Sequence, residues 1–159
     1  MRASASEFYA AAEEHLPRYL GIDVSTREGA AEGSLEIRPH HLAPNGYLHA
    51  GTVASLADTV CGFGCMASLP DGATGFTTIE LKVNYVATAL EGELRCRARL
   101  VHGGRTTQVW DAVVEDGNGK QLALFPPSFK MRVLRGVEMA SIPLQPVPRL
   151  SPGAASSTS

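Results

Sequence analysis

The sequence predicts one α+β domain in which an antiparallel sheet wraps around a single long helix, and three observations support that fold class. Residues 51–69 are apolar nearly all the way round, with Asp58 as their only charge, which is typical of a helix buried in a core. Apolar and polar residues alternate over 79–85 and again over 94–100, which indicates half-buried antiparallel strands. A length of 159 residues suits one domain rather than two.

The remaining elements follow in chain order. Apolar residues at helical spacing from Phe8 to Tyr19 predict a short amphipathic helix, which Ser6 can cap and Pro17 ends or kinks. Strands are expected over 21–26, 30–38, 79–85, 94–100 and 121–134, with a loop over 39–46 and hairpin turns at 102–105 and 115–119.

Two proline-containing segments interrupt this pattern. Pro126-Pro127 lies inside the last strand, where proline cannot donate to the ladder, so we expect a bulge or an unpaired edge there. Residues 137–159 are rich in Pro and Ser and predict a flexible tail. The expected organisation is a single domain over residues 1–136, including the N-terminal helix, followed by this tail.

Composition excludes several classes of protein. The net charge of −2 gives no electrostatic reason to bind nucleic acid or an anionic membrane, and no stretch approaches the ~20 apolar residues of a membrane span. The three cysteines follow no zinc or redox spacing, and Cys61 and Cys65 are interpreted as core residues. The histidines at 40, 41 and 49 lack metal-ligand spacing. We expect a cytoplasmic protein with reduced thiols and no metal or cofactor.

Asp58 is the first candidate for chemistry. It shares a helix face with small residues, namely Gly51, Ala54, Cys61 and Cys65 with Gly62 beside them, which predicts space above it for a ligand or another chain. A carboxylate on such a face needs a partner, a raised pKa or a catalytic role. An acid bonded to a partner backbone across an interface is an equally good interpretation.

The start of the long helix is the second candidate. The first turn of a helix has free N–H groups and a partial positive charge that can hold an oxyanion, and the small residues Ala50 and Gly51 let a carbonyl approach the backbone. A tight loop-to-helix junction without a ligand is the alternative. Arg95, Arg97 and Arg99, with Arg105 in the next turn, form either a solvated face or a phosphate contact.

Together these motifs resemble those of the PaaI-like hotdog-fold acyl-CoA thioesterases. The resemblance covers about residues 20–125. The motifs that carry it are Gly46-x-x-His49-Ala50-Gly51, Leu56-Ala57-Asp58, Gly75-Phe76-Thr77-Thr78 leading into Leu81-x-Val83-x-Tyr85, and the turn Gly104-Arg105-Thr106.

The resemblance implies a role for each matching residue. Asp58 would be the general base or nucleophile, the Ala50 N–H would polarise the thioester carbonyl beside His49, and Thr78 from a neighbouring subunit would help position water. The turn at Gly104, Arg105 and Thr106 would hold the CoA moiety. The fold implies a homodimer or homotetramer with sites at the subunit interface.

This chain departs from the family pattern at three positions. Ala43 replaces the usual Asn or Gln, and Asn45, which we keep among the candidate site residues, is close to it but out of register. Ala50 replaces a glycine but keeps the N–H, and Gly62 replaces a Ser or Thr that some members carry.

The predicted function is hydrolysis of an acyl-CoA or acyl-carrier-protein thioester. A non-catalytic hotdog that binds an acyl or aromatic ligand is the alternative, since the amide expected at position 43 is missing. A hydratase or dehydratase would need a different Asp/His motif, and a purely structural dimer module would leave Asp58 unexplained.

Overall fold

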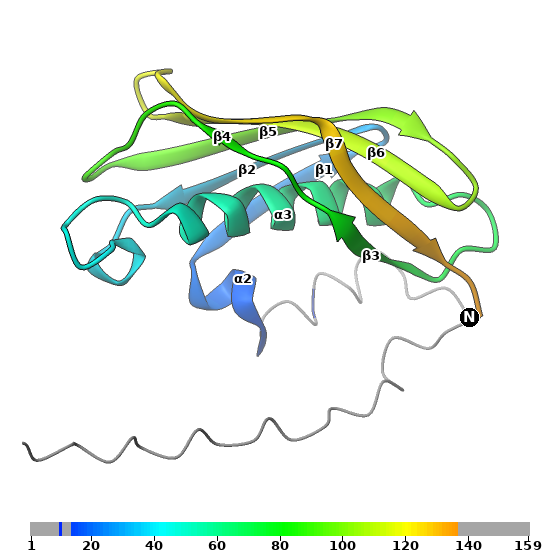
Figure 1. The fold of residues 1–159 in the computed structure, drawn as a ribbon. Coiled ribbons are helices and arrows are strands. Elements are labelled where there is room, and N and C mark those ends of the chain that lie inside the picture. Colours follow the sequence, from blue (N-terminus) through cyan, green and yellow to red (C-terminus); the bar gives the residue numbers. More distant parts are fainter. Residues whose placement is uncertain (1–9, 11–13, 137–159) are drawn as a thin grey trace, which may run out of the picture.

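The computed structural model describes residue 10 and residues 14–136, which form one seven-stranded antiparallel sheet with one long helix against it (Figure 1). The strand order is β1-β2-β5-β6-β7-β3, and the short β4 also pairs with β7. The predicted α+β architecture is therefore confirmed, while the predicted tail over 137–159 lies outside the described residues. The elements are α2 (Leu16–Tyr19), β1 (Ile22–Arg27), β2 (Ala30–Glu36), the 3₁₀ helix η2 (Pro39–His41), α3 (Ala50–Ala67), β3 (Gly75–Glu80), β4 (Asn84–Tyr85), β5 (Glu93–Gly103), β6 (Thr107–Asp116) and β7 (Gln121–Leu134).

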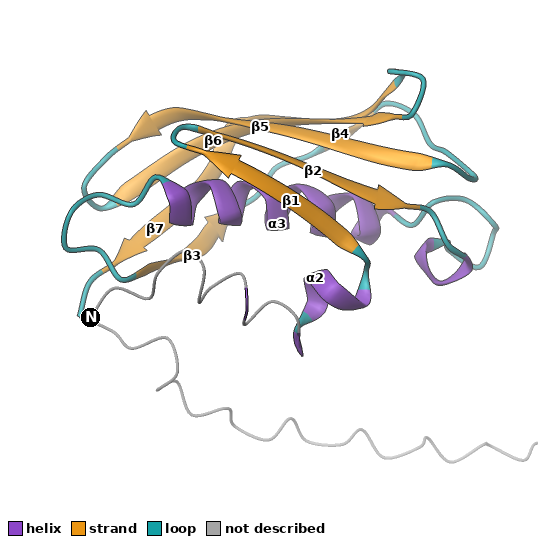
Figure 2. Ribbon diagram, turned by 180° about the vertical axis from the view of Figure 1, so that it is seen from behind, coloured by secondary structure: helices purple, strands orange, loops and turns teal. Residues whose placement is uncertain are grey.

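The N-terminal helical turn differs from the prediction. α2 begins after His15 with Pro17 in its first turn, so Pro17 does not end a helix there. Proline is accepted at this position because a first-turn N–H has no partner within the helix. Ser6, the expected cap, lies outside the described residues. Seen from behind, α2 lies on the same side of the sheet as α3 (Figure 2).

The core lies between α3 and the inner face of the sheet. Leu56, Val60 and Cys61 of α3 are fully buried, as are Trp110 and Phe129 of the sheet. In length and hydropathy α3 could cross a membrane, but 61% of it is buried inside the described fold, as expected of a core helix. The prediction of a buried central helix is confirmed.

A buried polar chain fixes the C-terminal end of α3. The indole Nε1–H of Trp110 donates to Oε1 of Gln108, 2.9 Å away, and Nε2 of Gln108 donates to the Ser68 carbonyl, 2.7 Å away. Ser68 also accepts from the Gly29 N–H through its hydroxyl. Because Gln108 is fully buried, each of its bonds is protected from water, and the helix end is held between β6 and the β1–β2 turn.

The proline pair in β7 falls at a bulge, as predicted. Trp110 pairs with Phe129, whereas Ala112, two residues further along β6, pairs with Phe125, so extra residues accumulate on β7. The neighbouring edge is interrupted at the same level, since β3 pairs with β7 up to Glu80 and pairing resumes only at Asn84. The predicted continuous strand over 79–85 is therefore split into β3 and β4.

The apolar side of this split strand is not buried by its own chain. Ile79 is 54% exposed, Leu81 37% and Tyr85 45%, and only Val83 packs against the core. Alternation predicted one covered face, and within the single chain that prediction is wrong at these three residues. A sheet edge with exposed apolar side chains is suited to pairing with another chain.

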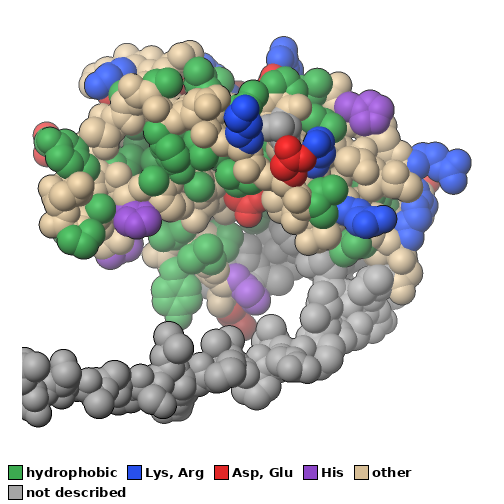
Figure 3. Space-filling model, in the orientation of Figure 1, with side chains coloured by type: hydrophobic (Ala, Val, Ile, Leu, Met, Phe, Trp, Pro, Cys, Tyr) green, Lys and Arg blue, Asp and Glu red, His purple; other side chains and the backbone are tan. Residues whose placement is uncertain are grey.

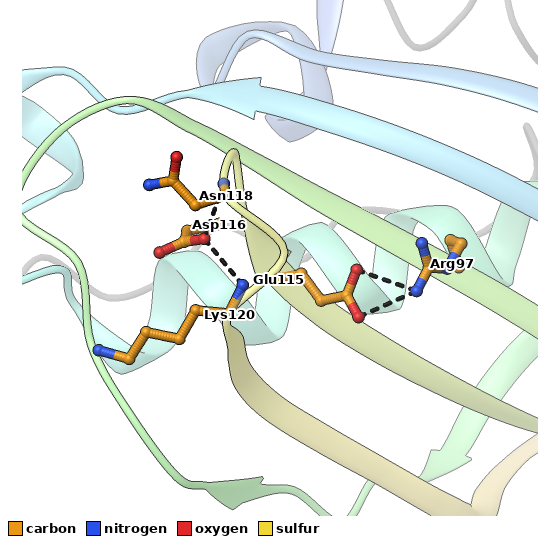
Figure 4. Close-up of polar contacts among 5 residues, drawn as sticks. All are labelled: Arg97, Glu115, Asp116, Asn118 and Lys120. Atoms are coloured by element: carbon orange, nitrogen blue, oxygen red, sulfur yellow. Dashed lines mark hydrogen bonds and ion pairs between the residues drawn. The ribbon is translucent and has the colours of Figure 1, made fainter.

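The outer face of the sheet carries ion pairs and a tight β6–β7 turn (Figure 4). Arg97 pairs with Glu115 across β5 and β6 at 2.9 Å, and Arg95 and Arg99 pair with Glu93 and Asp111. In the turn, Oδ1 of Asp116 accepts from the N–H groups of Asn118 and Lys120, both 2.9 Å away. Both predicted hairpin turns are confirmed.

A methyl group added at Gly64 should destabilise the fold, because a Cβ there would lie 2.6 Å from Cη2 of Trp110, whose ring Gln108 locks in place. We expect Gly64→Ala to lower the free energy of unfolding by about 1–3 kcal/mol, partly offset by the better helix propensity of alanine. Urea denaturation measures the change. Gly117→Ala is the control, since its Cβ would meet only the Glu93 carbonyl at 3.7 Å; equal stability of the two variants would contradict the packing.

Candidate active site

Asp58 and Thr78 meet beside the middle of α3. The Thr78 hydroxyl, on β3, donates to Oδ1 of Asp58 over 2.9 Å. The resemblance implied that Thr78 comes from a neighbouring subunit, but here it reaches Asp58 of its own chain. One carboxylate oxygen is thereby fixed, and among the described residues no other hydrogen bond is found for this carboxylate.

Burial raises the pKa of Asp58, and the hydrogen bond from Thr78 opposes that rise only in part. Removal from water disfavours the charged carboxylate, whereas the donated hydrogen bond stabilises it. The result is a carboxylate that is a stronger base than an exposed aspartate. Such a shift is typical of an acid that moves protons, although structural carboxylates also show it.

His49 caps the N-terminus of α3. Its Nδ1 accepts from the Gly51 N–H over 2.8 Å, and its backbone carbonyl accepts from Thr52 and Val53. A Cβ at Gly51 would lie 2.9 Å from that same Nδ1, so glycine is needed for the capping ring to fit. The Gly51 N–H is therefore already bonded within the chain. The absence of a side chain at Gly51 makes room for the His49 ring rather than for a substrate carbonyl.

The Ala50 N–H is the donor that this arrangement leaves open. The His49 N–H donates to the His41 carbonyl over 3.0 Å, and the Thr52 N–H donates to the His49 carbonyl. Within the described part of the chain, the Ala50 N–H has no acceptor. It lies at the positive end of an 18-residue helix, where an oxyanion is stabilised by both the N–H and the helix dipole.

The open N–H and the acid do not face one another within one chain. Asp58 follows Ala50 by eight residues, which places it about 12 Å further along the helix axis. First-turn N–H groups also point out of the helix end, away from Asp58. A donor and a base that act on one carbonyl must each lie about 3 Å from the reacting atoms or one water away. The two groups of a single chain therefore cannot serve the same carbonyl.

The start of α3 is held in place by His41, Thr52 and Tyr85, for which the sequence predicted no such role. His41 is 1% exposed, and its carbonyl also accepts from the Thr52 hydroxyl over 3.0 Å. Burial lowers the pKa of His41, which favours the neutral ring whose Nδ1 accepts from the Arg38 N–H. The Tyr85 hydroxyl donates to the Ala50 carbonyl over 2.9 Å. Apart from the local bond between Arg38 and His41, these contacts join segments that are apart in the sequence, so no local pattern signals them.

Asn45 is used inside its own turn. Its Oδ1 accepts from the Tyr47 N–H over 3.2 Å, and the turn closes through Gly46, whose φ is +84°. The amide is exposed, and no described hydrogen bond links it to Asp58 or Ala50. The structure therefore does not bring Asn45 together with the acid.

The predicted CoA-binding turn lies at the opposite end of α3 from Ala50 (Figure 1). Gly104 closes the hairpin through its N–H to the Thr107 carbonyl, and the Thr106 carbonyl accepts from Val133. Among the described residues no carboxylate pairs with Arg105, which is exposed. By contrast, the arginines of β5 are each neutralised by an acid, so Arg105 is the better of the predicted phosphate contacts.

The cysteines and histidines do not form a reactive centre in the described chain. Burial raises the pKa values of Cys65 and Cys96 to about 12, and that of Cys61 rises well above its usual value. All three are buried free thiols, as predicted, and their protonated form is unreactive. No three His, Cys, Asp or Glu side chains of the described segments gather as metal ligands.

Taken together, these elements form a domain of the hotdog type, with an acid on the central helix and an open N–H at its start. The family model of the thioesterase superfamily matches residues 45–123 of the chain. The chain is 31% identical over 110 residues to the 1,4-dihydroxy-2-naphthoyl-CoA hydrolase of Listeria monocytogenes. The aligned region covers 69% of this chain and 89% of that protein. The chain belongs to the thioesterase superfamily and is a thioester hydrolase.

Solved structures agree with this assignment. A conserved protein of Pseudomonas aeruginosa superposes with a TM-score of 0.68 and 32% identity, covering 74% of this chain and 92% of that one. The PaaI protein of the E. coli phenylacetic acid degradation operon superposes with a TM-score of 0.70 over 82% of this chain and 94% of that one; at 24% identity it bears on the fold alone. The hotdog fold and the PaaI-like resemblance are confirmed.

Removal of the Thr78 hydroxyl should change the pH dependence of the enzyme. The hydrogen bond from Thr78 lowers the pKa of Asp58, so Thr78→Val should raise that pKa further. If Asp58 acts as the carboxylate, the rise of kcat/KM with pH should move to higher pH in Thr78→Val and stay in place in Thr78→Ser, which keeps the hydroxyl. The pH profile of kcat/KM measures this, and identical profiles for wild type and Thr78→Val would contradict it.

Proposed function

We propose that the protein hydrolyses an acyl-CoA thioester at a composite site, with the Ala50 N–H supplied by one subunit and Asp58 by a second copy of the chain. The observation that carries this proposal is the Ala50 N–H at the start of α3, which has no acceptor among the described residues. It lies about 12 Å along the helix axis from Asp58, the acid whose pKa is raised. An acyl-carrier-protein conjugate is the alternative thioester.

The chemistry follows from these two groups. The thioester oxygen accepts a hydrogen bond from the Ala50 N–H, and the helix dipole stabilises the negative charge that develops there. Asp58, held by Thr78, takes a proton from the attacking water or attacks the carbonyl carbon itself. When Asp58 acts as the base, the carbon–sulfur bond breaks and the thiol leaves with the proton that the acid returns. When Asp58 attacks directly, the thiolate leaves as an acyl anhydride forms on Asp58. Water then hydrolyses the anhydride, which releases the carboxylic acid and regenerates the carboxylate, and the other proton of that water goes to the thiolate.

The surface around β3 and β4 supports pairing of two copies. Hydrophobic side chains gather over the β4 part of this edge, while basic and acidic side chains lie among them toward β3 (Figure 3). Those of Ile79, Leu81, Tyr85, Val86 and Leu90 are between 37% and 59% exposed. Antiparallel pairing of two such edges would bury them and run the two helices in opposite directions, so that the start of one α3 approaches the middle of the other.

The name of the Listeria relative supports a CoA thioester as substrate, and Arg105 supports recognition of the nucleotide phosphates. A guanidinium without an internal acid can pair with a phosphate without first losing another partner. Because α3 of a second copy would run antiparallel, the Arg105 turn of one chain would lie at the same end as Ala50 of the other.

Ala50→Pro should remove the oxyanion donor without removing the helix start. Ala50 is the first residue of α3, where proline fits, and the preceding residue His49 has φ −69° and ψ 131°, as a residue before proline requires. We expect kcat for acyl-CoA hydrolysis to fall roughly 10²–10³-fold. Release of free thiol, with circular dichroism as the fold control, measures it, and wild-type turnover would refute the donor.

Mixed dimers should regain activity if the site is composite. Asp58→Asn alone should lose roughly 10²–10⁴-fold. When Asp58→Asn and Ala50→Pro chains are co-expressed, half of the dimers should be mixed, and one of the two sites in each should be intact. About a quarter of wild-type activity should then return. A mixture as inactive as its parents would refute a composite site.

Arg105→Ala should weaken only the recognition of the nucleotide. We expect KM for an acyl-CoA to rise, by up to about tenfold, while turnover of the matching N-acetylcysteamine thioester, which lacks the nucleotide, stays unchanged. Arg99→Ala, whose guanidinium is paired with Asp111 over 2.7 Å, is the control and should leave KM unchanged. An equal effect on both thioesters would contradict a phosphate contact.

A further inference from the structure

The segment over 84–89 fastens the start of α3 from one side. The Tyr85 hydroxyl donates to the Ala50 carbonyl over 2.9 Å, and the Leu48 N–H donates to the Ala89 carbonyl over 3.1 Å. These two bonds lie on either side of His49, so the peptide group that carries the Ala50 N–H is held between them.

The same segment is itself firmly attached to the sheet. Asn84 and Tyr85 pair with Leu124 and Ala123 of β7. Directly afterwards, the N–H groups of Val86 and Ala87 both donate to the Leu122 carbonyl, over 2.9 and 3.2 Å. The phenol of Tyr85 therefore projects from a rigid support toward the helix start.

We propose that Tyr85 is a positioning residue that holds the Ala50 N–H in the direction the thioester oxygen requires. This inference rests on the proposed function of Ala50. The Tyr85 hydroxyl does not touch the reacting atoms. It holds the carbonyl of Ala50, the residue whose N–H is the proposed donor. Oxyanion donors act by being preorganised, so a donor that can swing loses transition-state stabilisation while substrate binding is retained. Partial burial also raises the pKa of Tyr85, which keeps the hydroxyl protonated and able to donate.

Tyr85→Phe removes this one hydrogen bond and preserves the ring. We expect kcat to fall roughly three- to tenfold, in line with the loss of one hydrogen bond, while KM changes little. The melting temperature and the oligomeric mass should match those of wild type. Tyr19→Phe is the matched control, since Tyr19 on α2 is 79% exposed, and it should leave kcat unchanged.

The double variant distinguishes positioning from direct contact with substrate. If Tyr85 acts through Ala50, Tyr85→Phe should cause no further loss in the Ala50→Pro background, where the donor is already absent. A full additional loss in that background, or wild-type kcat for Tyr85→Phe alone, would overturn the proposal. If Ala50→Pro itself keeps wild-type kcat, the proposed function fails and the role of Tyr85 fails with it. Loss in Ala50→Pro but not in Tyr85→Phe refutes the positioning role alone.

Discussion

The burial of α3 against the inner face of the sheet sets the distances of the candidate site. Its sheet-facing side chains belong to one cluster with Trp110, Phe125 and Phe129. Glycine at position 64 lets the Trp110 ring lie directly against the helix. The hydrogen bond from Gln108 to the Ser68 carbonyl holds the C-terminal end of α3. A helix held in this way cannot slide or bend by the ~12 Å that separate Ala50 from Asp58. This fixed separation is the reason for the proposal that a second chain supplies one of the two groups.

The proline pair in β7 affects the start of α3 through the neighbouring edge strand. Proline has no N–H, so the ladder beside Pro126-Pro127 fails and the edge strand is interrupted between Glu80 and Asn84. Pairing then restarts at β4, a strand of only two residues, one of which is Tyr85. The break frees the edge to change direction, and the restarted segment fastens the helix start through Tyr85 and Ala89. A feature without an evident role in the sequence thus acquires one in the fold.

Periodicity was sufficient to predict α3 and most of the strands, and the proline pair was sufficient to predict the bulge, because each depends on neighbouring residues. It failed where the outcome depends on distant ones. Gly62 suggested open space above the helix, yet a Cβ there would lie 2.8 Å from Cζ of Phe76 on β3. Alternation over 79–85 indicated an apolar face but could not say whether its own chain or a second copy covers it. The helix-start pattern predicted open N–H groups, whereas the choice of Ala50 over Gly51 depends on the orientation of the His49 ring.

The sequence left open whether Asp58 is a structural or a functional acid, and its electrostatics favour function. A structural carboxylate is normally surrounded by donors that lower its pKa, so that its ionised form stabilises the fold. Burial instead raises the pKa of Asp58, against one donor among the described residues, the Thr78 hydroxyl. The contribution of this carboxyl to stability is therefore present below its unfolded pKa and is lost as pH rises through the folded one. The ionised form of Asp58 is therefore less favourable in the fold than in the unfolded chain, which supports the proposed role of Asp58 in chemistry rather than in stability.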